Sequence, residues 1–418
     1  MDLKQEVLQL AKQAKEASLQ LLRAKTAQKN QALFNLADLL EQEQQSIFSA
    51  NAKDIQQAQA NNLDSARIDR LRITEKTIAG MIQACREVAN FPDPVGKIED
   101  MQVRPSGIKV GKMRVPLGVI AIIYESRPNV TIDAAILCLK AGNAVILRGG
   151  SEAFYSNQIL AQLITKALSQ AGLPQASVLT LPTPDRQAVT YLLDLEDYID
   201  VVIPRGGEGL IKAVVAQAKM PVLKHYKGVC HIYVDEEAEL KMALEIVYNA
   251  KVQRPGVCNA LECLLIHQNI ASKFLPLLEE KLAPAKVVLH ACPRAGAILN
   301  QSVPATQEDW GKEYLSLDLA VKVVDDFEQA CTHIAKYGSN HSEGIITNNY
   351  ALAMRFLAEV DASAVLVNAS TRFNDGGEFG LGAEIGISTS KLHAYGPMGI
   401  KELTTTKFIV LGQGEVRQ

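Results

Sequence analysis

The run Val119-Ile120-Ala121-Ile122-Ile123 decides the fold of this chain, because five consecutive apolar residues fit a strand that is buried on both faces. Similar short runs follow at Ala144–Leu147, Val178–Leu181 and Tyr198–Ile203. Helical periodicity separates them, at Thr131–Ala141, Tyr155–Ala171, Arg186–Leu193 and Gly207–Ala218. Strands that alternate with helices predict a parallel sheet with right-handed crossovers. Residues 116–235 therefore have the pattern of a Rossmann-type unit.

A second alternating unit is predicted for residues 236–367. Its expected helices are 236–250, 271–282 and 326–336, and its expected strands are Leu264–His267, Val287–His290 and Ala320–Val324. Residues 2–91 have the spacing of amphipathic helices, Met101–Val115 alternates like paired strands, and the tail ends in a strand-like Thr406–Leu411. We expect an α/β protein with two parallel-sheet domains and a small strand-rich element.

The composition is that of an ordinary globular protein: 418 residues, 48% hydrophobic, 21% charged, with a net charge of -3. No basic excess indicates a nucleic-acid partner. The seven cysteines and the histidines lack metal-ligand spacing, so we assign no metal. No apolar run reaches the ~18 residues of a membrane span, and the start Met1–Glu6 lacks a signal pattern. We therefore expect a cytoplasmic protein without membrane partners.

Cys258 is the candidate nucleophile. It lies in the Gly/Pro-containing segment Gln253-Arg254-Pro255-Gly256-Val257-Cys258-Asn259, with Lys251 just before it. A turn can expose a thiol, and nearby cations or a helix end lower its pKa from about 8.5. Most cysteines are small core residues, and we expect that role for Cys230 and Cys263.

Two glycine pairs follow predicted buried strands, Arg148-Gly149-Gly150-Ser151 and Pro204-Arg205-Gly206-Gly207-Glu208-Gly209. Without Cβ atoms, the backbone can turn sharply and approach a ligand, and the next helix offers free N–H groups to phosphate. Neither pair is the GxGxxG fingerprint, and each alone fits a tight turn equally well. Together they favour a phosphorylated ligand in the crevice of the sheet.

Asn129, in Tyr124-Glu125-Ser126-Arg127-Pro128-Asn129-Val130, also follows a buried strand. Its amide could donate to a developing oxyanion, or it could simply cap the next helix. Arg127, Arg254 and Arg372 are candidates for binding phosphate or carboxylate, since arginine binds both bidentately; surface ion pairs are the alternative.

The motif order resembles the aldehyde dehydrogenase superfamily, and within it the gamma-glutamyl phosphate reductase family, over essentially the whole chain. The motifs are Arg114–Ile120, Tyr124–Val130, Leu139–Gly150, Gln253–Leu261, Asn368–Phe373 and Asp375–Glu384. The resemblance implies that Cys258 is the catalytic thiol. It also implies that Asn129 and the Cys258 backbone N–H form the oxyanion hole.

The resemblance further implies a binding site for NADP(H). Arg148 matches the residue at the adenosine ribose, in the turn with Gly149, Gly150 and Ser151. Gly206 and Gly207 belong to the pyrophosphate segment, and Glu378 and Phe379 match the pair at the nicotinamide ribose.

The implied reaction is NADPH-dependent reduction of gamma-glutamyl phosphate to glutamate 5-semialdehyde, through a cysteine thioester, in L-proline biosynthesis. The resemblance also implies a homo-oligomer, with the upstream glutamate kinase as a candidate partner. Residues 1–100 and 116–235 would form the cofactor-binding domain, 236–398 the catalytic domain, and 101–115 with 399–418 the oligomerisation strands.

Three departures from the family pattern are informative. The stretch Pro221–His231 lacks the glutamate with which hydrolytic members activate water, which favours acyl-phosphate chemistry. Ser151 replaces an acid beyond Arg148, which favours NADPH, although a one-residue shift would put Glu152 there. Tyr395 stands where arginine is expected. An aldehyde dehydrogenase of another specificity and a non-catalytic cofactor-binding scaffold are the alternatives.

Overall fold

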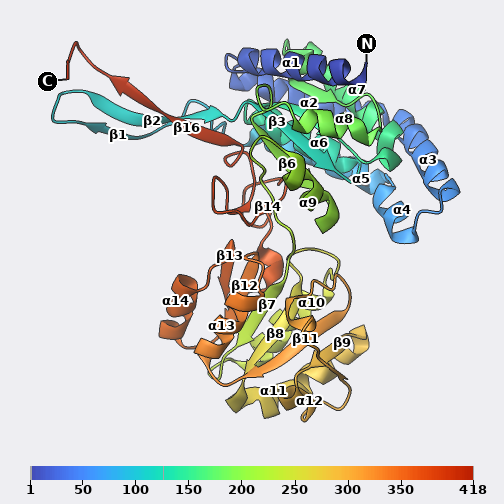
Figure 1. Ribbon diagram of the computed structural model, residues 1–418, viewed down its shortest axis with the longest axis vertical. Helices are drawn as coiled ribbons and strands as arrows, with labels where there is room; N and C mark the ends of the chain where they lie inside the picture. Colours follow the sequence, from blue (N-terminus) through green and yellow to red (C-terminus); the bar gives the residue numbers. More distant parts are fainter. Residues whose placement is uncertain (1, 126, 418) are drawn as a thin grey trace. The chain divides into compact units, whose positions relative to one another are not determined.

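The computed structural model describes residues 2–125 and 127–417 and divides into two compact units (Figure 1). The first unit contains Met1–Lys224, Gly380–Gly386 and Met398–Gln418, and the second contains His225–Phe379 and Ile387–Pro397. Ser126, which belongs to the motif around Asn129, lies outside the described residues. Each unit has its own parallel sheet with helices, which confirms the predicted α/β class.

The first unit is built on a parallel sheet whose strands pair in the order β5-β4-β3-β6. The strands are β3 (Val119–Tyr124), β4 (Ala144–Arg148), β5 (Val178–Thr180) and β6 (Val201–Arg205). The helices are α1 (Leu3–Leu21), α2 (Thr26–Gln42), α3 (Gln44–Ala60), α4 (Ser65–Leu71), α5 (Glu75–Asn90), α6 (Asn129–Lys140), α7 (Phe154–Gln170), α8 (Arg186–Leu193) and α9 (Glu208–Gln217), with 3₁₀ turns Ser151–Ala153 and Gln175–Ser177. After β3 the chain adds β4 and β5 on one side of it, and then crosses to add β6 on the other side. Ligands of α/β sheets bind at such a reversal.

The central strand β3 is fixed at its start by one carboxylate. All six of its residues are buried, as predicted from the apolar run. Asp200 accepts the N–H of Val119 (2.7 Å) and pairs with Lys15 of α1 (3.0 Å). Because Asp200 has this role, β6 begins at Val201 rather than at Tyr198, where the sequence predicted it.

A three-stranded antiparallel ribbon also belongs to the first unit. Its strands β1 (Ile98–Val103), β2 (Lys109–Pro116) and β16 (Thr404–Leu411) pair in the order β1-β2-β16. The predicted strand pairing within 101–115 and the predicted terminal strand are therefore confirmed. Several large apolar side chains of the ribbon are exposed, among them Val103 and Phe408. Its role in oligomerisation stays a prediction.

The second unit contains a larger parallel sheet, in the order β10-β9-β11-β8-β7-β12-β13. The strands are β7 (Cys230–Val234), β8 (Leu261–His267), β9 (Val288–Ala291), β10 (Val303–Pro304), β11 (Asp318–Val324), β12 (Ser342–Ile346) and β13 (Ala364–Val367), with a separate antiparallel pair β14 (Ile387–Ser388) and β15 (Gly396–Pro397). The helices are α10 (Leu240–Val252), α11 (Gln268–Leu282), α12 (Pro293–Gly296), α13 (Phe327–Tyr337) and α14 (Tyr350–Glu359), with 3₁₀ turns Ala283–Ala285, Asp309–Gly311 and Thr371–Phe373. The core lies where β7, β8 and β11 pack against α10 and α11.

The observed units differ from the predicted domain limits in two places. We placed residues up to 235 in the first domain, but β7 pairs with β8 and β12 in the second sheet. We placed all of 236–398 in the catalytic domain, but Gly380–Gly386 and Met398 belong to the first unit. An apolar run predicts a buried strand without showing which sheet receives it. For that reason the sequence could not set these boundaries.

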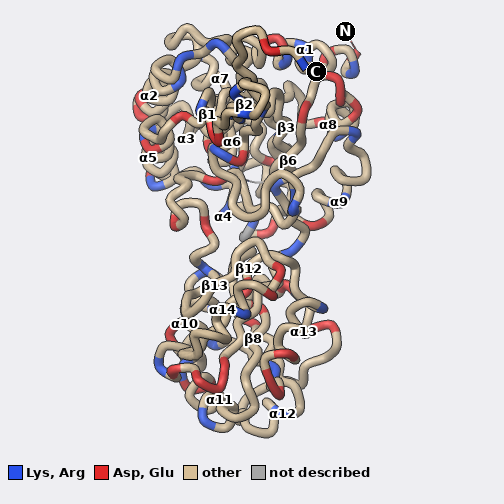
Figure 2. Tube along the Cα trace, turned by 90° about the vertical axis from the view of Figure 1, so that its left-hand side faces the viewer, with Lys and Arg blue, Asp and Glu red and all other residues tan. Residues whose placement is uncertain are grey.

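Charged residues of both signs are distributed along the two units (Figure 2). Within residues 2–125 and 127–417, no helix combines the length and apolar character needed to cross a membrane.

Candidate active site

Cys258 lies in the loop that joins α10 to β8 in the second unit. In the paired strands, Cys230 at the start of β7 stands opposite Leu261 at the start of β8, so Cys258 lies at the amino-terminal edge of the sheet. Its side chain is half-buried, whereas Cys230 and Cys263 are buried as predicted. The loop follows the carboxyl end of α10, whose dipole is negative. That helix end therefore does not favour an anion in this loop.

The Cys258 backbone is held by an unusually close approach of Gly228. A Cβ atom on residue 228 would lie 1.9 Å from the Cys258 carbonyl oxygen and 2.7 Å from its Cα. The Cys230 thiol donates to the same carbonyl (3.2 Å), and Glu313 accepts the Gly228 N–H (2.9 Å). Only glycine fits at 228, because any side chain would displace the nucleophile loop.

Two arginines lie near this thiol. Arg372 Nε donates to Gln253 Oε1 (3.0 Å), and Arg372 Nη1 donates to Asn259 Oδ1. Burial lowers the pKa of Arg372, and the positive charge of Arg254 lowers it further, while Asp375 and Cys258 oppose this shift. Arg372 is therefore close enough to interact electrostatically with both Arg254 and Cys258. An anion bound there would relieve the repulsion between the two guanidinium groups.

A buried ion pair closes the nucleophile loop at its ends. Lys251 Nζ, in the last turn of α10, donates to Leu261 O at the start of β8 (2.8 Å) and to Glu262 Oε2 (2.7 Å). Both charged side chains are completely buried. Burial lowers the pKa of Lys251 and raises that of Glu262 to about 7, and the attraction between them opposes both shifts. The sequence analysis noted Lys251 only as a nearby cation and missed Glu262.

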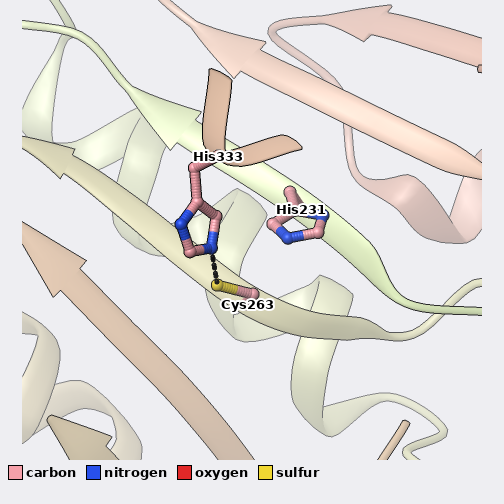
Figure 3. A group of neighbouring side chains, drawn as sticks. All are labelled: His231, Cys263 and His333. Carbon is pink, nitrogen blue, oxygen red and sulfur yellow. Dashed lines mark hydrogen bonds between the residues drawn. The ribbon is translucent and has the colours of Figure 1, made fainter. Parts of the chain in front are cut away.

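His231, Cys263 and His333 come together in the core of the second unit (Figure 3). His333 Nδ1 lies 2.9 Å from the Lys322 ammonium, so His333 Nε2, 3.6 Å from the Cys263 sulfur, carries the ring proton. Burial alone would lower the pKa of His231, but the Glu343 carboxylate, 3.0 Å away, raises it to about 10.

Both imidazole nitrogens that face Cys263 are therefore proton donors, whereas a metal ligand needs a free lone pair. The three residues lie on different elements, so no sequence spacing could have indicated the cluster. His231 Nε2 and Glu343 Oε1 are buried without a hydrogen-bond partner among the described residues, so the polar cluster is only partly satisfied. The assignment of no metal stays a prediction.

In the first unit, Arg148, Gly149, Gly150 and Ser151 line one pocket, as the sequence predicted for a ligand-binding turn. The other lining residues are Tyr124, Leu147, Phe154, Asn157, Gln158, Thr180, Leu181, Thr183 and Pro184. Arg148 Nη2 donates to Pro184 O (3.1 Å), but Arg148 Nε is buried without a hydrogen-bond partner among the described residues. A buried donor without a partner is uncommon, and it fits a site that receives a ligand acceptor.

Glu152 lies close to this arginine. Burial lowers the pKa of Arg148, and the Glu152 carboxylate opposes that shift. A Cβ atom on Gly150 would lie 2.3 Å from Glu152 Oε1, so the carboxylate packs against the turn itself. The open choice between Ser151 and Glu152 as the residue beside the ribose is therefore a matter for experiment.

The second glycine pair lies at the start of α9, where Gly207 is the N-cap. The Glu125 carboxylate accepts the Gly207 N–H (2.9 Å), and a Cβ atom on Gly206 would lie 2.6 Å from the same carboxylate. An anion contributed by the chain thus occupies this helix terminus, in keeping with its partial positive charge.

Asn129 is the first residue of α6, and Pro128 is the N-cap. Since Pro128 occupies the N-cap position and Asn129 is already helical, the alternative that Asn129 caps this helix is wrong. Instead Asn129 Nδ2 donates to Asp133 Oδ2 at 3.0 Å, one turn along the helix. The sequence analysis did not consider Asp133.

The remaining candidates are divided between the units. Arg127 belongs to the first unit and is half-buried. Glu378 and Phe379 end a segment of the second unit, where both backbone N–H groups bond to Asp375 and both side chains are exposed. Their roles beside a cofactor stay predictions.

Residues 3–314 match the model of the aldehyde dehydrogenase family, which is about three-quarters of the chain. The chain belongs to the aldehyde dehydrogenase family.

Within this family the chain is similar to proteins named gamma-glutamyl phosphate reductase. That of Desulfovibrio desulfuricans is 59% identical over 419 residues and covers 99% of both chains. The crystal structure of that from Thermotoga maritima is 47% identical, with a TM-score of 0.97 over 99% of this chain and 100% of its own. An engineered glycolyl-CoA reductase with bound NADP+ shares the fold, with a TM-score of 0.69 at 16% identity over 97% of this chain and 96% of its own. The resemblance inferred from the motifs is confirmed.

Tyr395 stands where the resemblance led us to expect arginine. Tyr395, at the expected arginine, donates its hydroxyl to Asp361 (3.1 Å), which also pairs with Lys391 (2.7 Å). Burial and this carboxylate raise the pKa of Tyr395 to about 12. The tyrosine thus anchors its loop within the second unit.

Replacing Gly228 by alanine should displace the nucleophile loop, because the added methyl group would overlap the Cys258 carbonyl. We expect a fall in melting temperature and loss of turnover, measured by calorimetry and steady-state assay. Gly256→Ala is the matched control in the same loop, since its Cβ would meet only Leu315 O at 3.7 Å. Equal melting temperatures for the two variants would contradict the close approach.

Replacing Lys251 by methionine should destabilise the second unit by about 3–5 kcal/mol, because Glu262 would be left buried and unpaired. Lys281→Met is the control, since its ion pair with Glu245 has the same 2.7 Å length but is exposed. Exposed pairs contribute only ~0–1 kcal/mol. Thermal unfolding of both variants measures the difference, and equal shifts would show that burial does not govern this pair.

Proposed function

We propose that this protein is an NADPH-dependent gamma-glutamyl phosphate reductase, which forms glutamate 5-semialdehyde and releases phosphate in L-proline biosynthesis. The observation that carries the proposal is the half-buried Cys258 thiol, which interacts electrostatically with Arg372, the neighbour of Arg254. Relatives at 59% identity over the full length carry this name. An accessible thiol among cations suits attack on an anionic acyl phosphate.

Cys258 is the nucleophile of the proposed mechanism. Its thiolate attacks the acyl carbon of gamma-glutamyl phosphate, the bond to the phosphate oxygen breaks, and a thioester forms. NADPH, when bound, supplies the hydride that reduces this thioester. The thiohemiacetal oxyanion on Cys258 then collapses to the aldehyde and frees the thiolate. The covalent step divides one difficult reaction into two easier ones.

Arg254 and Arg372 are proposed to hold the leaving phosphate or the substrate carboxylate. Arg372 is fixed by Gln253 and Asn259, which leaves its other N–H groups for the substrate. Because these partners come from the nucleophile loop, the cation and the thiol are positioned together. Arg127 is the corresponding proposal in the first unit.

Asn129 and the Cys258 backbone N–H are proposed to donate to the two oxyanions that form, one with each tetrahedral carbon. Donors of this kind typically lower the barrier by ~2.7–4 kcal/mol each. The Asn129 amide is already ordered by Asp133, which supports its use as a fixed donor.

Acyl transfer to water would waste the thioester, and the chain offers no acid within Pro221–His231 to activate water. Two carboxylates bond to this stretch, and both are engaged by its backbone: Glu313 accepts the Gly228 N–H, and Glu343 accepts the His231 N–H. A phosphate-independent aldehyde dehydrogenase is the second candidate function. Retention of both Cys258 and Asn129 argues against a scaffold without catalysis.

Arg148 and its pocket are proposed to bind the adenosine end of NADPH, where the unpartnered Nε–H can meet a ligand oxygen. Gly206 and Gly207 would approach the pyrophosphate, and Glu378 with Phe379 the nicotinamide ribose. We also propose a homo-oligomer assembled through the ribbon β1-β2-β16, a cytoplasmic location, and the upstream glutamate kinase as a partner.

The reverse reaction tests the proposed function directly. Glutamate 5-semialdehyde should reduce NADP+ only when phosphate is present, because phosphate must cleave the thioester. Absorbance at the NADPH band measures this, with Cys258→Ala as a control that should lose turnover and still bind NADPH. NADP+ reduction that does not depend on phosphate would favour the second candidate, an aldehyde dehydrogenase of the hydrolytic kind.

Cofactor preference should depend on the Arg148 turn. Arg148→Ala should weaken NADPH much more than NADH, since only NADPH carries a phosphate that the guanidinium can bind. Ser151→Glu should shift preference further toward NADH by charge repulsion. Glu152→Gln distinguishes the neighbouring carboxylate: if Glu152 faces the ribose, this variant raises preference for NADPH. The ratio of kcat/KM for NADPH to that for NADH measures each effect. If all three variants keep the wild-type ratio, this turn does not bind the 2′-phosphate.

A further inference from the structure

The Asn129 amide is held by a carboxylate that no step of the proposed reaction uses. Asn129 Nδ2 donates to Asp133 Oδ2 at 3.0 Å, and both residues lie on the first turns of α6. A primary amide has two N–H bonds on Nδ2. Asp133 accepts one of them, so the other points in a fixed direction.

Asp133 also interacts electrostatically with an arginine of a neighbouring strand. It is half-buried, and the Arg205 guanidinium, from the end of β6, favours its charged form. Arg205 is confined in turn by the backbone of Gly386, where a Cβ atom would lie only 2.8 Å from Arg205 Nη1. The Cys85 thiol, from α5, is another titratable group that interacts with Asp133. Asp133 of α6 thus lies within electrostatic range of Arg205 at the end of β6.

We propose that Asp133 is a positioning residue for the reaction: it locks the side-chain amide of Asn129 so that the second N–H is aimed at the developing oxyanion. The inference rests on the proposed role of Asn129. A free asparagine side chain at a helix start can rotate about two bonds, and a donor misplaced by about 1 Å can cost ~10²-fold in rate. The carboxylate removes that freedom before the substrate arrives.

A double-mutant cycle tests the inference. Asn129→Ala should lower kcat by roughly 10²–10³, as expected for a lost oxyanion donor. Asp133→Ala should lower kcat about tenfold, with KM and the NADPH dissociation constant little changed, since only a fraction of the donor's alignment is lost. In the double variant Asp133→Ala should add nothing, because there is no amide left to position. A purely structural role for Asp133 would instead give additive losses.

Asp133→Asn provides the conservative control. Its amide oxygen can still accept the Asn129 N–H, so kcat should stay within about threefold of wild type, the difference between a charged and a neutral acceptor. Burial raises the pKa of Asp133 to about 6, against the opposing effects of Asn129 and Arg205. As pH falls through 6, wild-type kcat should decline toward the Asp133→Asn value, whereas this variant should show no decline there.

The outcomes separate the two levels of the proposal. An unchanged kcat in Asn129→Ala overturns the oxyanion role, and the present inference with it. A large loss in Asn129→Ala, combined with additive losses in the double variant, overturns only the positioning role. If calorimetry shows that Asp133→Ala does not fold, the pH profile decides. A decline of kcat below pH 6 in Asp133→Asn that equals the wild-type decline excludes Asp133 as the positioning residue.

Discussion

The buried bond from Lys251 to Leu261 and Glu262 is the constraint on which the nucleophile loop depends. A loop of glycine, proline and polar residues has little intrinsic rigidity. Here the last turn of α10 and the first residue of β8 are joined by an ammonium group that water does not reach. Burying that charge is costly, and only the combination of a carboxylate and a carbonyl offsets the cost. The loop between α10 and β8 can therefore hold a half-buried thiol in one conformation.

The two sheets offer chemistry at opposite ends. In the first unit, Arg148 ends β4 and Gly207 follows β6, so both lie at the carboxyl ends of the strands. The Gly207 N–H is already engaged by Glu125, whereas Arg148 Nε is a donor without a partner among the described residues. In the second unit the thiol precedes β8, at the amino-terminal edge, near the negative end of α10. That helix end does not favour an anion, whereas Arg372 interacts with the thiol from the side of the loop. This division is consistent with the proposed roles of Arg254 and Arg372 in the second unit and of Arg148 in the first.

Much of the fold could be predicted because buried parallel strands are continuous apolar runs, and β3, β4 and β8 stood out for that reason. The sheet that receives β7 could not be predicted, because the apolar residues of β7 would suit either sheet equally. The thiol and the glycine pairs could be found from motifs. Gly228, Asp133 and the histidine cluster could not, because their partners are distant in sequence or have no recognised pattern. Glu262 did leave a signal: a lone carboxylate inside the apolar run Leu261–Ile266 requires a buried partner.

Charge balance connects these features to the proposed chemistry. Negative charge develops around the reacting carbon in each step of the proposed reaction: first on the thiolate, then on the departing phosphate and on the oxyanions. The described surroundings of Cys258 supply two guanidinium groups, while the carboxylates of Glu262 and Glu313 are each tied to donors of the scaffold. Carboxylates engaged in this way do not compete with the substrate for arginine, and they are poor bases for activating water. The same interactions that hold the thiol in place thus favour acyl-phosphate reduction over hydrolysis of the thioester.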